Sequence, residues 1–352
     1  MTNNRICYFD YAKGILVFLV VLGHCVSYGC GYDYMAGDVY YSNWLYRIIY
    51  TFHMPAFALV SGYFIWYSIK KFQLAGLHIL PFVRDRAVRL ILPLAIYRFI
   101  HYLYDFCFVR SCNWKGYIYN FVTDFLFASW YIWAIFFATV IICFVHKYLK
   151  DKWWIYAIIV ALSMVVPDFK YAEFKFVLPF FFIGYLYNKN IDKAPQFFKN
   201  KNLLFVAVNA VVFAVTVALY AHDTYIYISG YSILNSEWSY HLWQNILRFV
   251  CGFSGSITVL YFITFLPDYR TCKFMPIKLP LRIIADLGTS SFGIYIIHAY
   301  VNYAVRYLCK DRTGFNFWFV LMVSFVVCGV SHLATVILRK WKVTNKLFLG
   351  GK

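Results

Sequence analysis

The sequence predicts an all-α fold, a polytopic membrane helix bundle of about ten transmembrane helices with both termini in the cytoplasm. Of the 352 residues, 62% are hydrophobic and only 14% are charged, a composition outside the range of soluble proteins. Apolar runs of about 17–25 residues, long enough to cross a bilayer, recur along the whole chain. The basic residues gather in alternate loops between these runs.

The predicted spans follow one another without a linker or a soluble-sized segment, so we expect one membrane domain over residues 1–352. The fifth and sixth spans are short, and the first lacks the small-residue cleavage site of a signal peptide. In chain order they cover roughly residues 12–30, 44–67, 88–108, 130–149, 153–167, 174–188, 203–221, 242–265, 283–307 and 317–338.

The first span carries Lys13 at its start and His24 near its centre. Ionisable groups inside a bilayer are costly, so they usually face an interior cavity and serve a function. Eleven residues of α-helix turn through roughly 1100°, about 20° past three turns, and rise about 16 Å. The two side chains therefore lie on one face, and a ligand touching both would be long and thin, as acyl-coenzyme A is. Asp10, one turn before Lys13, is placed to form an ion pair with it.

The second span contains two motifs. His53 precedes Met54-Pro55, where the proline removes a backbone hydrogen bond and is expected to kink the helix. His53 is a candidate residue for binding the long, thin ligand suggested by the first span. The alternative is that it only forms a hydrogen bond to the local backbone. Ser61-Gly62 allows close approach of a neighbouring helix or of a ligand. A catalytic role for Ser61 is less favoured, because no acidic or histidine partner lies close to it at a helical spacing.

Arginines gather at the start of the third span, at Arg84, Arg86 and Arg89. Arg86 and Arg89 are three residues apart and so are neighbours on one helix face. Guanidinium groups match the geometry of phosphates, so the cluster is a candidate site for nucleotide phosphates. The alternative is a purely topological role, because cytoplasmic loops carry arginine in any case.

Aromatic and histidine residues mark the later part of the chain. His101 and His298 fall in the third and ninth spans, where a lone histidine is often only a hydrogen-bonded packing residue. The loops at 109–129 and 222–241 are rich in tyrosine and tryptophan, which suits a membrane interface. The alternative is an acceptor site, because aromatic faces with a few polar partners also suit sugar rings.

Basic residues mark one side of the predicted membrane domain. The positive-inside rule makes that side the cytoplasm, which places both termini there and requires an even number of spans. Because topology accounts for the net charge of +18, we expect no nucleic-acid partner. The residues on this side are Arg5, Lys70, Lys71, Arg84, Arg86, Arg89, Lys147, Lys150, Lys152, Lys189, Lys193, Lys199, Lys201, Arg270, Lys273, Lys278, Arg282, Arg339, Lys340, Lys342, Lys346 and Lys352.

Cysteine and carboxylate patterns suggest little further chemistry. The ten cysteines form no CxxC pair and no zinc spacing, and most lie inside predicted spans as small hydrophobes. Cys25, next to His24, is a candidate acyl-carrying nucleophile. Adjacent helical residues point about 100° apart, however, so Cys25 is not expected to share a cavity with His24. We expect no metal and no proton relay, because no ligand pattern and no mid-span carboxylate pair is present.

Six segments in order along nearly the whole chain carry a shared pattern. YFDYAKGILVFLVVLGH, which ends at His24, separates a basic residue from a histidine by ten positions. FHMPAFALVSGYF begins at Phe52, and RAVRLILP places an Arg-x-x-Arg pattern at Arg86 and Arg89. The others are WYIWAIFF from Trp130, FVLPFFFIGYLY from Phe176 and SSFGIYIIH from Ser290. Together they resemble the acyltransferase-3 family of integral membrane acyltransferases, most of all its fucose 4-O-acetylase-like branch.

The resemblance implies a ten-helix bundle in the cell membrane. Such a protein takes an acyl group, usually acetyl, from cytoplasmic acyl-coenzyme A and places it on a hydroxyl, commonly of a sugar in a surface polysaccharide. Functional roles are implied for Lys13, His24, Ser61-Gly62, Arg86 and Arg89. The acyl-coenzyme A is then a co-substrate, and no cofactor is expected.

The resulting hypothesis is direct acyl transfer with His24 as general base, which takes the proton of the acceptor hydroxyl as it attacks the thioester. Arg86, Arg89 and Arg84 would hold the nucleotide phosphates, and Lys13 would line the entrance. A route through acyl-His24 is the mechanistic alternative. The alternative from another class is a transporter or lipid-linked sugar flippase, in which the intramembrane charges line a translocation path.

Overall fold

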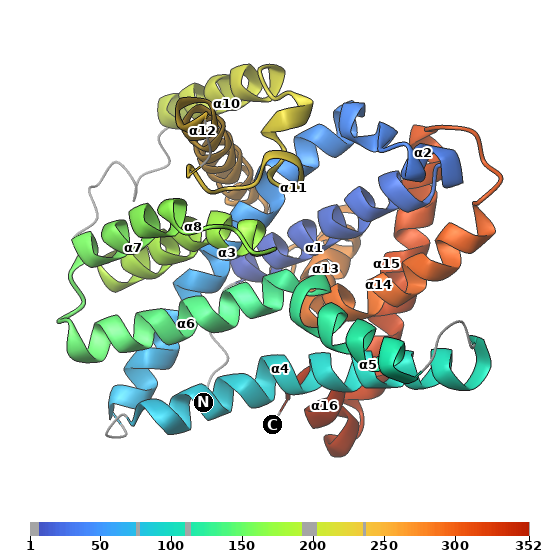
Figure 1. Cartoon of the computed structure of the whole chain (residues 1–352), viewed down its shortest axis with the longest axis horizontal. Coiled ribbons are helices and arrows are strands. Elements are labelled where there is room, and N and C mark those ends of the chain that lie inside the picture. The colour runs from blue at the N-terminus through green and yellow to red at the C-terminus, as the bar shows by residue number, and fades with distance from the viewer. Residues whose placement is uncertain (1–6, 75–77, 110–113, 192–202, 235–236, 352) are drawn as a thin grey trace. The chain divides into compact units, whose positions relative to one another are not determined.

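The computed structural model describes residues 7–74, 78–109, 114–191, 203–234 and 237–351. This part of the chain is all-helical and contains no strand (Figure 1). It divides into two compact units, each assembled from separate stretches of chain. Unit 1 comprises Met1–Val60, Ala194–Thr224 and Ile246–Ile337, and unit 2 comprises Ser61–Lys193, Tyr225–Asn245 and Leu338–Lys352.

Five helices in the described ranges are long and apolar enough to cross a membrane. Each overlaps a predicted span, because a long apolar run satisfies its backbone N–H and C=O groups by forming a helix. They are α1 (Cys7–Tyr28), α3 (Trp44–Leu74), α6 (Trp130–Tyr148), α12 (Trp238–Ile263) and α15 (Phe317–Arg339).

Four further predicted spans overlap one α-helix each. Two of these helices are apolar but short, α7 (Trp153–Val165) and α10 (Leu203–Ala218). The other two are α4 (Ile79–Tyr104) and α8 (Ala172–Lys189). The span predicted at 88–108 continues past α4 into the π-helical turn at 105–109. The proline of the second span does not interrupt α3, which runs through Pro55. The total of about ten spans stays a prediction.

The predicted span at 283–307 is wrong as a single helix. Helix α13 (Met275–Thr289) ends and α14 (Ser291–Leu308) begins at Ser290, whose backbone N–H donates to the carbonyls of Asp286 and Leu287. The break follows a run of glycine, threonine and serine, which are weak helix formers. The long apolar runs on both sides of this short polar segment hid the break in the sequence.

Helix α1 is fixed within unit 1 by close packing on α13. A Cβ atom on Gly288 would lie 1.8 Å from the backbone oxygen of Asp10, and one on Gly14 would lie 2.0 Å from that of Ile284. Each glycine lies against the backbone of the opposite helix, so the two helices approach more closely than larger residues would allow. The hydroxyl of Tyr8 also donates to the carbonyl of Leu260, 2.9 Å away. These contacts hold the helix that carries Lys13 and His24.

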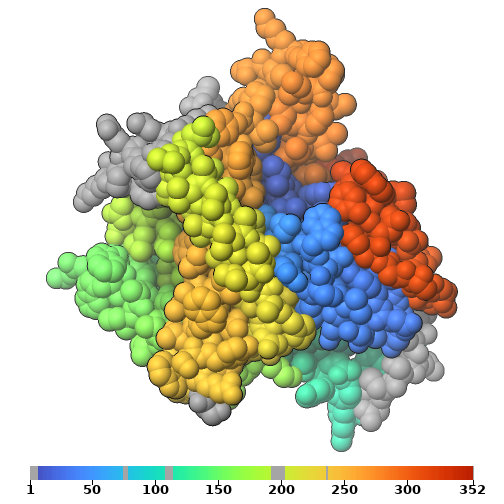
Figure 2. Space-filling model, turned by 90° about the horizontal axis from the view of Figure 1, so that it is seen from above, coloured from blue at the N-terminus to red at the C-terminus, as the bar shows by residue number. Residues whose placement is uncertain are grey.

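The segment after α1 lies against the turn between α14 and α15. It forms the short helices α2 (Tyr32–Ala36) and η1 (Val39–Ser42). The backbone N–H of Gly314 donates to the carbonyl of Cys30 over 3.0 Å, and the rings of Trp44 and Phe317 stack with centroids 6.2 Å apart. Figure 2 shows this contact as the blue segment beside the red-orange one.

Unit 2 is built around α4, α6, α7 and α8. Helix α6 packs against α8 and α4, and α7 packs against α8. The carboxyl-terminal helix α16 (Lys342–Leu349) lies against α4 (Figure 1), where a Cβ on Gly350 would be 2.0 Å from the backbone oxygen of Arg89. The shorter elements are the π-helical turns η2 (Asp105–Val109) and η3 (Asp124–Ala128), and the α-helices α5 (Trp114–Thr123) and α11 (Ile226–Ser229). The 3-10 turn η5 (His222–Thr224) belongs to unit 1.

Candidate functional site

Helices α1, α3 and α14 of unit 1 bring three histidines together. The rings of His24 and His298 have centroids 5.2 Å apart. The ring of Tyr50 lies 6.4 Å from that of His24 and 4.9 Å from that of His53. The sequence places these histidines on three separate spans and gives no sign that they are neighbours.

His24 combines accessibility with a lack of hydrogen-bond partners. Its side chain is part-exposed, whereas Gly23 and Cys25 on either side are buried. In the ranges that the structure describes, no hydrogen bond reaches its ring, which lies near the rings of Tyr28, Tyr50 and His298. Cys25 points elsewhere, as the sequence predicts: it is 0% exposed and its thiol donates to Asn302 Oδ1 over 3.7 Å.

His53 and His298 have one ring nitrogen committed to their own helices. The Nδ1 atom of His53 lies 2.6 Å from the carbonyl oxygen of Ile49, and that of His298 lies 3.0 Å from that of Ile294. Because a carbonyl oxygen can only accept, each Nδ1 carries the proton and each Nε2 is left as an acceptor. For His53, this hydrogen bond to the carbonyl of Ile49 is the local backbone bond that the sequence analysis gave as the alternative to ligand binding.

Lys13 forms the ion pair expected at the start of α1. Its Nζ lies 3.5 Å from Asp10 Oδ1, and its side chain is 26% exposed whereas that of Asp10 is 9% exposed. Because α1 runs without interruption from Cys7 to Tyr28, Lys13 and His24 share a helix face. Asp10 balances the charge of Lys13, so the lysine does not stand as an isolated cation.

Ser61 and Gly62 lie in unit 2 and face protein neighbours. A Cβ on Gly62 would be 2.0 Å from the backbone oxygen of Phe181, so the close approach at this glycine is made with α8. The hydroxyls of Ser61 and Tyr131 are 3.4 Å apart. Ser61 is only half-buried, which leaves its hydroxyl the more open of the two positions.

The arginine cluster at the start of α4 contains an acidic residue that the sequence analysis did not consider. Asp85 Oδ2 accepts from Arg89 Nε over 2.8 Å and lies 3.8 Å from Arg86 NH2. The Arg86 guanidinium also lies over the ring of Phe82, at 5.2 Å. Arg84 is exposed. The four-residue spacing of Asp85 and Arg89 is a helical ion-pair spacing and could have revealed this contact.

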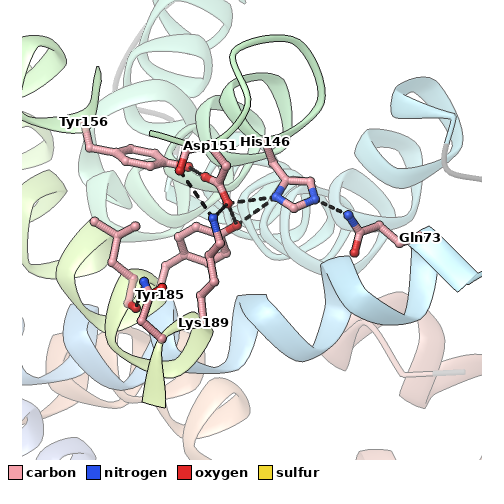
Figure 3. Close-up of polar contacts among 8 residues, drawn as sticks. Gln73, His146, Asp151, Tyr156, Tyr185 and Lys189 are labelled. Carbon is pink, nitrogen blue, oxygen red and sulfur yellow. Dashed lines mark hydrogen bonds and ion pairs between the residues drawn. The ribbon is translucent and has the colours of Figure 1, made fainter. Parts of the chain in front are cut away.

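Asp151 forms the centre of a second polar cluster in unit 2 that the sequence did not indicate (Figure 3). Its carboxylate accepts from Tyr185 over 2.7 Å and from Lys189 over 2.5 Å, and Tyr156 also donates to it. His146 Nδ1 lies 2.9 Å from the same carboxylate. The cluster joins the turn after α6 to α7 and α8.

The hydrogen bonds determine the charge state of Asp151. Burial alone would raise the pKa of this carboxyl, but the bonds from His146, Lys189, Tyr156 and Tyr185 outweigh burial and hold the pKa well below its usual range. In the sequence Asp151 lies between Lys150 and Lys152, which look like ordinary cytoplasmic anchors. In the described ranges, no group of three metal-ligating side chains could hold a metal ion.

Comparison with known proteins assigns the chain to a family. The model of the acyltransferase-3 family, described as an acyltransferase domain, matches residues 6–336. A nodulation protein NolL from Mesorhizobium japonicum is 32% identical over 143 residues, which cover 40% of this chain and 36% of that protein.

A second NolL, from Sinorhizobium fredii, is 25% identical over 309 residues, which cover 85% of this chain and 78% of that protein. No solved structure gives a significant match. Because the family model covers nearly the whole chain, the protein belongs to the acyltransferase-3 family of membrane acyltransferases.

Proposed function

We propose that this protein is an O-acyltransferase that moves an acyl group, acetyl in the first instance, from acyl-coenzyme A to a hydroxyl of a sugar or surface polysaccharide precursor. One observation carries the proposal. His24 has an accessible ring without hydrogen bonds to the described residues, on a helix whose neighbouring side chains are buried. A neutral imidazole with a free ring nitrogen has the chemistry of a general base, because that nitrogen can take the proton of a hydroxyl as the hydroxyl attacks.

The proposed reaction is a single displacement. A ring nitrogen of His24 takes the proton of the acceptor hydroxyl while the hydroxyl oxygen forms a bond to the thioester carbonyl carbon. The carbon–sulfur bond then breaks, and His24 returns the proton to the departing thiolate of coenzyme A. The acceptor leaves as an ester, and the enzyme regains its initial protonation state.

The remaining roles follow from the chemistry of each residue. Arg86 and Arg89 are assigned to the nucleotide phosphates, because guanidinium groups bind them through paired hydrogen bonds, with Arg84 as a more exposed helper. A phosphate would compete with Asp85 for Arg89. Lys13 is assigned to the entrance on the face of His24. His53 and Ser61-Gly62 are assigned to positions along the donor.

The proposal also includes the setting of the enzyme. We place it in the cell membrane as one multi-pass domain over residues 1–352, with about ten spans and both termini cytoplasmic. The cytoplasmic acyl-coenzyme A then reaches the side that carries the basic loops. The acyltransferase family match favours this function over a transporter or flippase.

The test replaces the proposed base. His24→Ala should lower acyl transfer by at least about 100-fold, the usual contribution of a general base, while the protein still inserts in the membrane. Purified protein is incubated with radiolabelled acetyl-coenzyme A and a glycan extract from cells that lack the protein, and free coenzyme A and labelled glycan are counted. His101→Ala, which changes a histidine outside the cluster, is the matched control.

Two results would overturn parts of the proposal. Full activity of His24→Ala would show that His24 is not the general base. If no extract leads to release of coenzyme A, the proposed enzymatic function is wrong. The acyl-His24 route makes a different prediction, because labelled acyl would then remain on the wild-type protein when acceptor is omitted. Denatured protein should carry no label in a direct transfer.

A further inference from the structure

The ring of His298 lies next to that of His24, and its available nitrogen, Nε2, can only accept a hydrogen bond. Its Nδ1–H is used by the carbonyl of Ile294, so only Nε2 remains, and the side chain is 3% exposed. Polar atoms in such surroundings are normally hydrogen-bonded. The chain places this acceptor against His24, which still has an N–H to donate.

The spacing of the two rings suits a hydrogen bond between them. Two imidazoles joined by an N–H···N bond of about 3 Å have centroids about 5 Å apart. The centroids of His24 and His298 are 5.2 Å apart, and their planes are inclined by 43°. No hydrogen bond among the described residues holds the His24 ring, so the ring can turn about its last side-chain torsion and direct an N–H at Nε2 of His298.

We propose that His298 is a positioning residue for acyl transfer, whose Nε2 accepts a hydrogen bond from His24 and so fixes the tautomer of the base. With one nitrogen of His24 holding its proton toward His298, the other presents a lone pair to the acceptor hydroxyl. Orientation of a catalytic histidine by an acceptor on its far nitrogen is a general requirement of such bases. This inference rests on the proposed function of His24.

The proton balance of the transfer is unchanged by this contact. The hydroxyl proton moves to the free nitrogen of His24 and then to the thiolate sulfur as the carbon–sulfur bond breaks. The proton between His24 and His298 stays on His24 throughout. His298 acts by stabilising the imidazolium that exists between the two transfers, and it remains neutral with its own proton on the carbonyl of Ile294.

Two substitutions separate the positioning role from a structural one. Asparagine at position 298 can still donate to the carbonyl of Ile294, but it lacks an acceptor at the position of Nε2. Glutamine places an amide oxygen near that position and gives up the bond to Ile294. A positioning role therefore predicts that His298→Gln is more active than His298→Asn, whereas a role in packing or in the backbone bond predicts the reverse order.

The experiment measures initial rates with acetyl-coenzyme A and the glycan extract for both variants, with His101→Gln as the matched control. We expect kcat of His298→Asn to fall on the order of 10- to 100-fold with little change in KM for acetyl-coenzyme A, and His298→Gln to retain most activity. A folding defect would affect glutamine more, since asparagine keeps the backbone bond. Thermal midpoints of both variants are recorded alongside the rates.

A variant without the base makes failure of the two proposals distinguishable. In a His24→Ala background, His298→Asn should cause no further loss of transfer, because the base that it positions is gone. If His24→Ala is inactive but His298→Asn is at least as active as His298→Gln, the positioning role of His298 is overturned. The assignment of His24 as the general base is then unaffected. If His24→Ala is fully active, the proposed function of His24 falls first.

Discussion

Asp151 and His24 are polar side chains with opposite settings. The Asp151 carboxylate is 4% exposed and receives hydrogen bonds from tyrosine, lysine and histidine donors, whereas the His24 ring receives none from the described residues. A carboxylate held in this way is fixed in position and in charge. A histidine that is accessible and uncommitted can change its protonation state during a reaction.

Loss of the Asp151 charge should destabilise unit 2. Asp151→Asn leaves Lys189 beside a neutral amide, and removing one partner of a buried pair typically costs about 3–5 kcal/mol. Asp286→Asn is the matched control, because Asp286 and Arg282 form an exposed pair with atoms 3.8 Å apart, worth about 1 kcal/mol at most. Unfolding of the purified protein in detergent measures both changes, and equal losses would contradict this view of the cluster.

Acid should remove the stability that Asp151 supplies. A carboxyl whose pKa is lowered on folding contributes its full stability above its unfolded pKa, near 4, and loses it as the pH falls toward the lowered folded value. The wild-type melting temperature should therefore fall more steeply below about pH 4 than that of Asp151→Asn. Parallel acid-side melting curves for the two proteins would count against the pKa shift.

The pairing of α1 with α13 depends on two glycines, each set against the backbone of the other helix. Gly14 faces Ile284 and Gly288 faces Asp10, so the contact has no room for a side chain at either position. The same helix α1 holds His24 against α14 through its ring contact with His298. Displacement of α1 would therefore change the geometry of the histidine cluster.

Enlarging one glycine should expose this dependence. Gly288→Ala would place a methyl group 1.8 Å from the backbone oxygen of Asp10, and such overpacking typically costs about 1–3 kcal/mol. Gly329→Ala in α15 is the matched control, because nothing lies within 4 Å of its Cβ position, and it should be neutral or stabilise the helix by up to about 1 kcal/mol. Thermal unfolding distinguishes the two, and an equal effect would refute the close contact.

The whole molecule is expected to cross the membrane with its basic loops in the cytoplasm. Reporter fusions test this arrangement: alkaline phosphatase joined after Tyr231 should be active outside the cytoplasm, and green fluorescent protein joined after Lys201 should fluoresce inside it. Exchange of the two reporters should abolish both signals. Active phosphatase after Lys201 would overturn the predicted orientation.

Local features of the fold could be predicted from the sequence, and long-range features could not. Hydropathy located the five long apolar helices, and helical spacing put Lys13 and His24 on one face and paired Lys13 with Asp10. The break at Ser290 was missed because the polar segment around it is short and long apolar runs lie on both sides. The contact of His298 with His24 joins helices from opposite ends of the chain, and no local spacing encodes it.

The contact between α16 and α4 affects how the enzyme can be handled. The backbone of Gly350 approaches that of Arg89, so a purification tag fused to the carboxyl terminus would start next to the helix that carries the arginine cluster. An acidic tag there would place negative charge beside Arg86 and Arg89, which we assign to the nucleotide phosphates, and would compete with a phosphate for them if that assignment holds. Kinetic measurements should therefore use protein from which a protease has removed the tag.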